Sequence, residues 1–366
     1  MAEHRRIRSL GVERPGTMFF FEYDEGPPGD GQVRLEMLYT GFSAGTELTF
    51  LKGTNPYLHA RWDGERGLFV PGEAGQHYPV PFMGYMEVAR VIESRSPAFA
   101  VGQVVATTFA HKSGHTADPF HELLVALPED MDPILGIYVA QMGPIAANGI
   151  LHADAEMFGT NVQALGVGIT GRPVAVIGGG VVGLLTALFA QRSGAADVVL
   201  ADPSAERRAR AEALGIEAVT EDELVDLAKL RWRHGGGDRG ADFTFQTRAH
   251  ASALQAALRT LRPQGTVIDL AFYQGGAEAV RLGEEFHHSG LAIRCAQIGR
   301  VPRGLGFAWD RQRLARETID LLEEHGDAIK DHVITHVVPM NEAPAFLQHL
   351  TETRPEFLQV VFKGAE

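Results

Sequence analysis

Six residues at 178–183 read Gly-Gly-Gly-Val-Val-Gly and directly follow the apolar run Val-Ala-Val-Ile. The glycines fall at the spacing G-x-G-x-x-G, which allows a tight turn, a close backbone approach to a pyrophosphate and close packing of a helix on a strand. The N–H groups that begin the following helix would face the phosphates. The spacing predicts a dinucleotide site formed by Gly178, Gly179, Gly180, Val181, Val182 and Gly183.

An acidic residue strengthens this prediction. Asp202 ends the next apolar run, 19 residues after Gly183, where a carboxylate would accept hydrogen bonds from the adenosine ribose. The same carboxylate would repel a 2′-phosphate, so the sequence favours NAD over NADP. Arg207 is close enough in sequence to reach an adenosine phosphate or ring, which leaves NADP open. A plainer alternative is that Asp202 only caps the helix that follows it.

The elements that must position these residues are predicted from periodicity. Short alternating runs punctuated by Gly and Pro indicate a β-rich first third, and from about residue 140 strands and helices alternate. Repeated strand–helix units imply an α/β fold with a doubly wound parallel sheet. We expect a substrate domain at 1–140, a dinucleotide-binding domain at 141–332 and a return to the first domain at 333–366. The strands expected are 33–38, 88–92, 101–109, 174–177, 198–201, 241–245, 265–270, 292–298 and 357–362, and the helices 181–193, 205–214 and 252–261.

Composition excludes several classes of protein. The chain has 366 residues, 45% hydrophobic and 22% charged, which fits two globular domains. A net charge of -13 argues against nucleic-acid binding. The N-terminus lacks the apolar core of a signal peptide, and glycines interrupt the longest apolar stretch, residues 174–190. We therefore expect a cytoplasmic protein without a membrane partner.

One segment follows no period. Residues 53–79 are rich in Gly, Pro, aromatic and charged residues, and Tyr57, Trp62 and Phe69 lie among them. Long segments of this kind in compact domains are often functional. The segment is expected to be a pocket wall or lid, or only a surface insertion.

With these features the chain resembles the medium-chain dehydrogenase/reductase superfamily of zinc-type alcohol dehydrogenases over nearly its whole length. The resemblance rests on the segments 41–47, 81–91, 101–106 and 258–267 and on the fingerprint itself. It implies a GroES-like β-rich substrate domain beside the Rossmann domain. The Gly-Thr-Glu at 45–47 is most similar to the branch of bacteriochlorophyllide hydroxyethyl dehydrogenases and their relatives.

The sequence differs from zinc-dependent members of the family at the residues that bind the metal. Zinc-dependent members carry Cys where this chain has Ser43, a His–Glu pair where it has Tyr85 and Met86, and Cys where it has Met142. The single cysteine, Cys295, also cannot supply the four-cysteine structural lobe. The sequence therefore predicts no zinc and no other metal. The clustered histidines, His111, His115, His121, His287 and His288, are interpreted as solvated or hydrogen-bonded loop residues.

The resemblance implies hydride transfer between a nicotinamide ring and a substrate carbon. Without zinc, hydroxyl donors must stabilise the oxyanion and a general acid–base must move the proton. By position, Ser43, Glu47 and Tyr85 are the catalytic candidates. Tyr85 is alternatively a packed aromatic, and Glu47 a structural hydrogen-bond acceptor in its turn. Phe272, after a sheet strand, resembles the family stretch beside the nicotinamide and is alternatively an ordinary loop aromatic.

Three functions compete at this stage. The first is a zinc-independent, NAD-dependent oxidoreductase for a secondary alcohol or ketone, a small-molecule substrate of secondary metabolism. The second is a zinc-free enoyl or quinone reductase that uses NADPH, and the third is a nucleotide-binding protein without turnover. We favour the first, because Asp202 argues against NADPH. The apolar stretch at 291–299, guarded only by Arg294, further predicts an edge strand that pairs in a homodimer.

Overall fold

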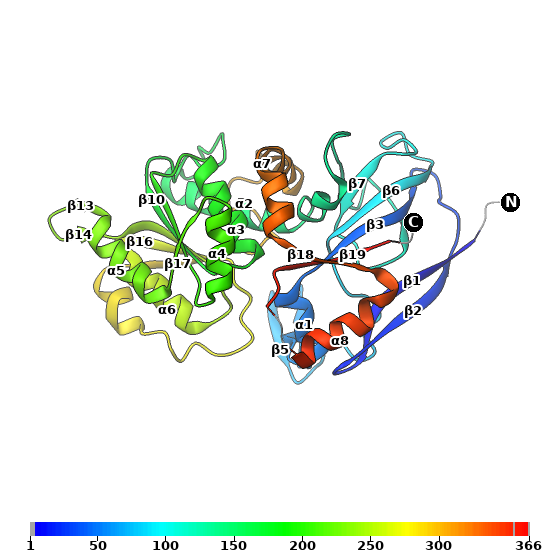
Figure 1. Ribbon diagram of the computed structural model, residues 1–366, viewed down its shortest axis with the longest axis horizontal. Coiled ribbons are helices and arrows are strands. Elements are labelled where there is room, and N and C mark those ends of the chain that lie inside the picture. Colours follow the sequence, from blue (N-terminus) through cyan, green and yellow to red (C-terminus); the bar gives the residue numbers. More distant parts are fainter. Residues whose placement is uncertain (1–3, 354–355, 365–366) are drawn as a thin grey trace. The chain divides into compact units, whose positions relative to one another are not determined.

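The chain divides into two structural units. The computed structural model describes residues 4–353 and 356–364. Unit 1 comprises Met1–Gln141 with Ile334–Glu366, and unit 2 comprises Met142–Val333. In Figure 1 the blue, cyan and red segments belong to unit 1, and the green and yellow segments to unit 2. Within the described residues, no helix has the length and apolar character needed to cross a membrane.

The sheet of unit 2 explains where a ligand can bind. Its six strands run in the order β12-β11-β10-β15-β16-β17, and every neighbouring pair is parallel. Numbered by chain position the order is 3-2-1-4-5-6, the doubly wound Rossmann order, which confirms the predicted fold class. The order reverses between β10 and β15. The strands are β10 (Pro173–Ile177), β11 (Asp197–Ala201), β12 (Glu217–Val219), β15 (Ala241–Gln246), β16 (Leu261–Asp269) and β17 (Ala292–Cys295).

Helices bury both faces of this sheet, which explains why its strands are apolar. Residues 174–177 of β10 are fully buried, as expected for a parallel strand covered by helices. Helix α7 contacts α2, α3 and α4, whereas α5 packs on α6 (Figure 1). The helices are α2 (Met142–Phe158), α3 (Val181–Arg192), α4 (Ala205–Ala213), α5 (Glu221–Arg231), α6 (Ala251–Thr260) and α7 (Arg311–His332), with a π-helical turn η3 (Leu282–Phe286) and a hairpin β13 (Arg233–Gly235) to β14 (Asp238–Arg239).

Unit 1 is the predicted β-rich part. Its main sheet runs β18-β19-β3-β6-β7-β9, with β8 also paired to β3, and β1 and β2 form a separate antiparallel pair. The strands are β1 (Arg5–Arg14), β2 (Thr17–Glu25), β3 (Val33–Phe42), β6 (Glu87–Ser94), β7 (Val104–Thr107), β8 (Gly114–Ala117), β9 (Leu124–Ala126), β18 (Ile334–Pro339) and β19 (Gln359–Lys363). The helices are α1 (Ala44–Lys52) and α8 (Ala343–Thr353), with short 3-10 turns η1 (Pro56–Leu58), η2 (Pro133–Tyr138) and η4 (Met340–Glu342).

The structure shortens two predicted strands and adds a hairpin. The strand expected at 101–109 covers only Val104–Thr107. The strand expected at 292–298 ends at Cys295, because the chain turns there and the Asn148 amide donates to the carbonyls of Ala296 (3.4 Å) and Arg300 (3.2 Å). The aperiodic segment 53–79 contains a regular hairpin, β4 (Ala60–Asp63) paired with β5 (Leu68–Pro71). Both hairpin strands are only four residues long and lack a buried face, so the alternation that marks a strand is missing.

Candidate functional site

The glycine fingerprint lies at the point where the order of the Rossmann sheet reverses. Gly178 has a φ of +112°, and a Cβ built on it would come within 2.5 Å of Thr247 Oγ1, just after β15. A Cβ on Gly183 would lie 1.8 Å from the Gly178 carbonyl oxygen. A Cβ on Gly180 would meet nothing closer than Arg207 Nη1 at 4.0 Å. Two glycines are thus required by packing, and the third leaves open space at the N-terminus of α3, where a pyrophosphate would fit.

Asp202 is built into the same loop. It is 3% exposed, and its Oδ2 and Oδ1 accept hydrogen bonds from the backbone N–H groups of Gly179 and Ser204, both at 2.8 Å. The N-cap of α4 is Ser204 and not Asp202, so the capping alternative for Asp202 is wrong. Arg207, in the first turn of α4, lies beside Gly179. The structure therefore brings the fingerprint, Asp202 and Arg207 together.

The remaining cofactor candidates are Val181, Val182 and Phe272, which lie in segments that follow strands of this sheet. Val181 and Val182 form the first turn of α3 and are half-buried. Phe272 lies in the loop after β16 and is 40% exposed. Its neighbour Tyr273 is bound through the hydroxyl to Gln246 Nε2 (3.1 Å), the last residue of β15. That bond ties the loop of Phe272 to the carboxyl ends of the strands.

The three catalytic candidates meet in unit 1. Ser43 is the N-cap residue of α1, and its backbone N–H donates to Glu47 Oε1 at 2.8 Å. The Tyr85 hydroxyl donates to Ser43 Oγ, although the two residues are 42 positions apart in the chain. Ser43 is 5% exposed and Glu47 is 3% exposed. The hydrogen bond within the turn, which was the alternative role expected for Glu47, is therefore present, and it holds the backbone of Ser43 in place.

A fourth residue, His111, completes this group. It is fully buried, its Nε2 lies 2.7 Å from Glu47 Oε2, and its Nδ1 lies 2.7 Å from Thr40 Oγ1. A neutral ring with its proton on Nε2 satisfies both contacts, since it donates to Glu47 and accepts from Thr40. Gly84, with a φ of +95°, lets the ring approach, because a Cβ there would lie 2.7 Å from it. The sequence showed His111 only as one of several clustered histidines, 64 positions from Glu47.

The electrostatics keep Tyr85 a neutral donor. Burial and then the charge of Glu47 raise the pKa of Tyr85 to about 12, against the hydrogen bonds to Ser43 and Thr46, which lower it. Because Tyr85 donates its hydrogen bond to Ser43 Oγ, the Ser43 hydroxyl can itself donate to a third group. The pair can therefore donate a hydrogen bond to an oxyanion.

The donor set around Ser43 does not fit a zinc ion. Catalytic zinc sites use three protein ligands, mainly thiolate, imidazole and carboxylate. Here one imidazole and one carboxylate are bound to each other, and the other side chains are hydroxyls. Over the part of the chain that the structure describes, no three His, Cys, Asp or Glu residues form a group that could hold a metal.

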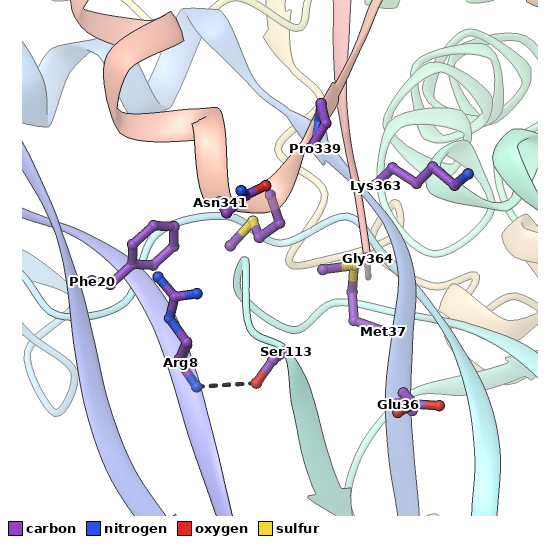
Figure 2. A pocket seen from close by; sticks show the side chains of 10 residues that line it. Arg8, Phe20, Glu36, Met37, Ser113, Pro339, Asn341, Lys363 and Gly364 are labelled. Atoms are coloured by element: carbon purple, nitrogen blue, oxygen red, sulfur yellow. Dashed lines mark hydrogen bonds between the residues drawn. The ribbon is translucent and has the colours of Figure 1, made fainter. Parts of the chain in front are cut away.

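A cavity of about 440 Å³ in unit 1 does not include the candidate catalytic residues (Figure 2). The Arg8 guanidinium lies 4.2 Å from the centroid of the Phe20 ring, and the Arg8 backbone N–H donates to Ser113 Oγ at 3.0 Å. Since Ser43, Glu47 and Tyr85 are absent from its lining, the cavity is separate from their cluster. The lining residues are Arg8, Phe20, Glu36, Met37, Ser113, Pro339, Met340, Asn341, Lys363 and Gly364.

Comparisons with known proteins agree with this geometry. A family model described as zinc-binding dehydrogenase matches residues 181–301. The D-guloside 3-dehydrogenase of Escherichia coli (strain K12) is 25% identical over 358 residues, 96% of this chain and 97% of the relative. Among solved structures, the alcohol dehydrogenase TADH from Thermus sp. ATN1 has a TM-score of 0.72 at 17% identity and covers 98% of this chain and 100% of its own.

A putative zinc-binding dehydrogenase from Sinorhizobium meliloti 1021, solved bound to NADP, has a TM-score of 0.69 at 18% identity, covering 98% of this chain and 99% of its own. At these identities the structures show the fold alone. The family model and the full-length relative are both described as dehydrogenases. The chain is thus similar to proteins of the medium-chain, zinc-type alcohol dehydrogenase-like family.

Proposed function

We propose that this chain is a zinc-independent oxidoreductase that exchanges a hydride between a nicotinamide cofactor, NAD in preference to NADP, and a secondary alcohol or ketone. In this proposal unit 2 is the dinucleotide-binding domain and unit 1 carries the groups that act on the substrate oxygen. The observation that carries it is the hydroxyl pair of Ser43 and Tyr85, with Glu47 bound to the Ser43 N–H. The resemblance aligns Ser43 and Tyr85 with zinc ligands of the family.

The chain's own groups have definite roles in such a reaction. When bound, a nicotinamide dinucleotide supplies the hydride acceptor or donor. The Ser43 hydroxyl donates to the substrate oxygen as negative charge develops there, and Tyr85 polarises Ser43 by donating to its Oγ. In the oxidation direction the hydride goes to the nicotinamide and the alcohol's hydroxyl proton is released to solvent. Glu47 and His111 are positioning residues that fix the N-terminus of α1. The Ser43 and Tyr85 side chains in place of zinc ligands, together with the Gly-Thr-Glu at 45–47, support the zinc-lacking branch similar to bacteriochlorophyllide hydroxyethyl dehydrogenase-like members.

Unit 2 has groups suited to the pyrophosphate and the ribose of a nicotinamide dinucleotide. The open space at Gly180 and the N–H groups that begin α3 suit a pyrophosphate. From its spacing to the fingerprint we expect Asp202 at the adenosine ribose, and its two backbone contacts still leave lone pairs for ribose hydroxyls. Arg207, beside Gly179, is the group that would favour NADP. The substrate proposal, a secondary alcohol, agrees with the name of the full-length relative, a D-guloside 3-dehydrogenase.

Replacement of Asp202 tests the cofactor preference. Asp202→Asn keeps an oxygen for one backbone N–H but removes the charge, so NADH binding should weaken about tenfold while NADPH binding is unchanged or stronger. Fluorescence titration of both cofactors measures this, and Glu206→Gln, an exposed carboxylate on α4, is the matched control. Tighter binding of NADPH than of NADH by the unmodified chain would show that Arg207 dominates.

Replacement of Tyr85 tests the hydroxyl pair. Tyr85→Phe keeps the ring and should lower kcat about tenfold, and Ser43→Ala should lower it about a hundredfold, because the second loses the direct donor. With a pKa of about 12 for Tyr85, the ratio of wild-type to variant kcat should stay constant from about pH 6 to about pH 10.

Tyr78→Phe is the matched control, since its hydroxyl binds the Phe50 carbonyl elsewhere in unit 1. Full activity of Tyr85→Phe with a lowered melting temperature would leave Tyr85 a packed aromatic only.

We also propose a homodimer formed through β17. This strand ends the six-stranded sheet, and Ile293 is 38% exposed on it. Arg294 is paired with Glu156 of α2 at 2.8 Å, so it guards the edge only weakly. The Ala296 N–H donates inward to Asp269 (2.9 Å), and alternate residues of a parallel strand bond to the same neighbour. The N–H of Ile293 therefore faces the free edge.

A proline at this position distinguishes the edge from other interfaces. Ile293→Pro removes only an outward N–H and should convert a dimer to a monomer of 39.7 kDa. Light scattering at micromolar concentration gives the mass, and Ile293→Val is the control. A monomeric unmodified chain, or a dimer that survives the proline, would contradict the proposal.

A further inference from the structure

A pocket of about 450 Å³ lies in the loop that joins β17 to α7. Its lining includes three arginines, Arg300, Arg303 and Arg311, and a single acidic residue, Asp310. Asp310 is the N-cap of α7, and its side chain already accepts the backbone N–H of Arg313 at 2.7 Å. The pocket therefore has an excess of positive charge, although the chain as a whole carries a net charge of -13.

Arg300 and Arg303 line the pocket without an acidic partner among the residues described by the structure. Both side chains are exposed. By contrast, Arg231, which is also exposed in unit 2, lies 3.2 Å from Asp197 and 2.6 Å from Glu217. A concave surface lined by one sign of charge raises the local concentration of the opposite ion. The pocket is therefore suited to an external anion.

Arg311 adds a partly buried cation at the first residue of α7. Burial lowers the pKa of its guanidinium, because the charge loses part of its hydration. An anion beside it would replace that hydration with charge-assisted hydrogen bonds. The planar fork of a guanidinium matches the paired oxygens of a carboxylate or a phosphate, so both kinds of anion fit.

The loop that carries the arginines is held in one shape. The Asn148 amide of α2 donates to the Arg300 carbonyl oxygen at 3.2 Å. Leu305 is fully buried, and the indole N–H of Trp309 donates to the Val162 carbonyl oxygen at 3.0 Å. Because the backbone is already ordered, an anion that binds here does not have to order the loop as well.

The pocket lies at the edge of the sheet where the cofactor is expected. β10 and β17 belong to one parallel sheet, so the loop after β17 leaves the same edge as the fingerprint after β10. A dinucleotide lies across this edge, with one half on each side of the point where the strand order reverses. Asp202, expected at the adenosine ribose, follows β11, so the nicotinamide half is expected over β15, β16 and β17. A substrate that meets the nicotinamide ring would therefore lie close to the arginines.

The phosphates of the cofactor do not account for these arginines. The pyrophosphate is expected at Gly180 after β10, and β17 lies three strand spacings from β10, about 14 Å. A 2′-phosphate on the adenosine ribose would lie farther away, because β11 is on the opposite side of β10. The anion that fits the pocket is therefore assigned to the substrate.

We propose that Arg300, Arg303 and Arg311 bind an anionic group of the substrate, either a carboxylate or a phosphate. This deepens the proposed function and rests on it, because the same substrate carries the secondary alcohol that is oxidised. The substrate is then a small hydroxy acid or hydroxyalkyl phosphate, which a pocket of about 450 Å³ accommodates.

Three small alcohols test this substrate class. 2-Butanol is neutral, 3-hydroxybutyrate carries a carboxylate and glycerol 3-phosphate carries a phosphate, and each has a secondary hydroxyl. We expect kcat/KM for one of the two anions to exceed that for 2-butanol about tenfold or more, because charge-assisted hydrogen bonds are made only to the anion. The anion that is preferred identifies the group as carboxylate or phosphate, and equal kcat/KM for all three alcohols would contradict the proposal.

Substitution of the arginines tests whether they cause that preference. Arg300→Gln and Arg303→Gln should each lower the ratio of kcat/KM for the anion to that for 2-butanol about tenfold. Arg300→Lys keeps the charge and should lower the ratio less. Arg316→Gln, an exposed arginine of α7 outside the lining, is the matched control. An equal loss with both substrates would leave the ratio unchanged and would assign the arginines a structural role only.

Calorimetric titration tests the pocket separately from the reaction. 3-Hydroxybutyrate or glycerol 3-phosphate should bind the unmodified protein saturably, and binding should weaken about tenfold in Arg300→Gln and at an ionic strength of about 0.5 M. Binding that depends on Arg300 but leads to no turnover would support the site and contradict the proposed reaction. The site would be overturned if neither anion bound, or if binding persisted unchanged in both Arg300→Gln and Arg303→Gln.

Discussion

The buried hydrogen bond between Glu47 and His111 organises the candidate chemistry of unit 1. A carboxylate that is 3% exposed is costly to bury unless it accepts hydrogen bonds, and Glu47 accepts one from the imidazole at 2.7 Å and one from the Ser43 N–H. The other nitrogen of the imidazole ring, Nδ1, lies 2.7 Å from the Oγ1 of Thr40 in β3. Through these contacts β3, the start of α1 and the strand-connecting segment of His111 are locked together. Removal of Glu47 would leave two buried donors without a partner.

A second buried carboxylate, Asp202, likewise fixes the backbone around a candidate site in unit 2. Asp202 accepts two backbone N–H groups, one of them from Gly179 within the fingerprint, and so holds the loop in the shape that leaves Gly180 open. Each unit thus uses one carboxylate to shape the backbone around a candidate site. In unit 2 that backbone leaves open space at Gly180, and in unit 1 it aligns a pair of hydroxyls.

Local and non-local features differed in how well the sequence predicted them. The fingerprint and its Rossmann sheet were predicted because a strand, a glycine turn and a helix follow each other within 20 residues. The Glu47–His111 contact was missed because it joins residues 64 positions apart and no spacing rule links them. The hairpin at Trp62 was missed because its strands are short and lack a buried face. The family resemblance singled out Ser43, Glu47 and Tyr85 by position, but it did not predict the hydrogen bond from Tyr85 to Ser43, which the structure adds.

The central claim is that a hydroxyl pair, set by Glu47 and His111, does the work that zinc does elsewhere in the family. Elemental analysis of the purified protein, with turnover measured before and after dialysis against a chelator, tests it most directly. The account predicts less than about 0.1 zinc per chain and unchanged turnover after chelation. One zinc per chain, with activity lost on chelation and restored by zinc alone, would contradict it.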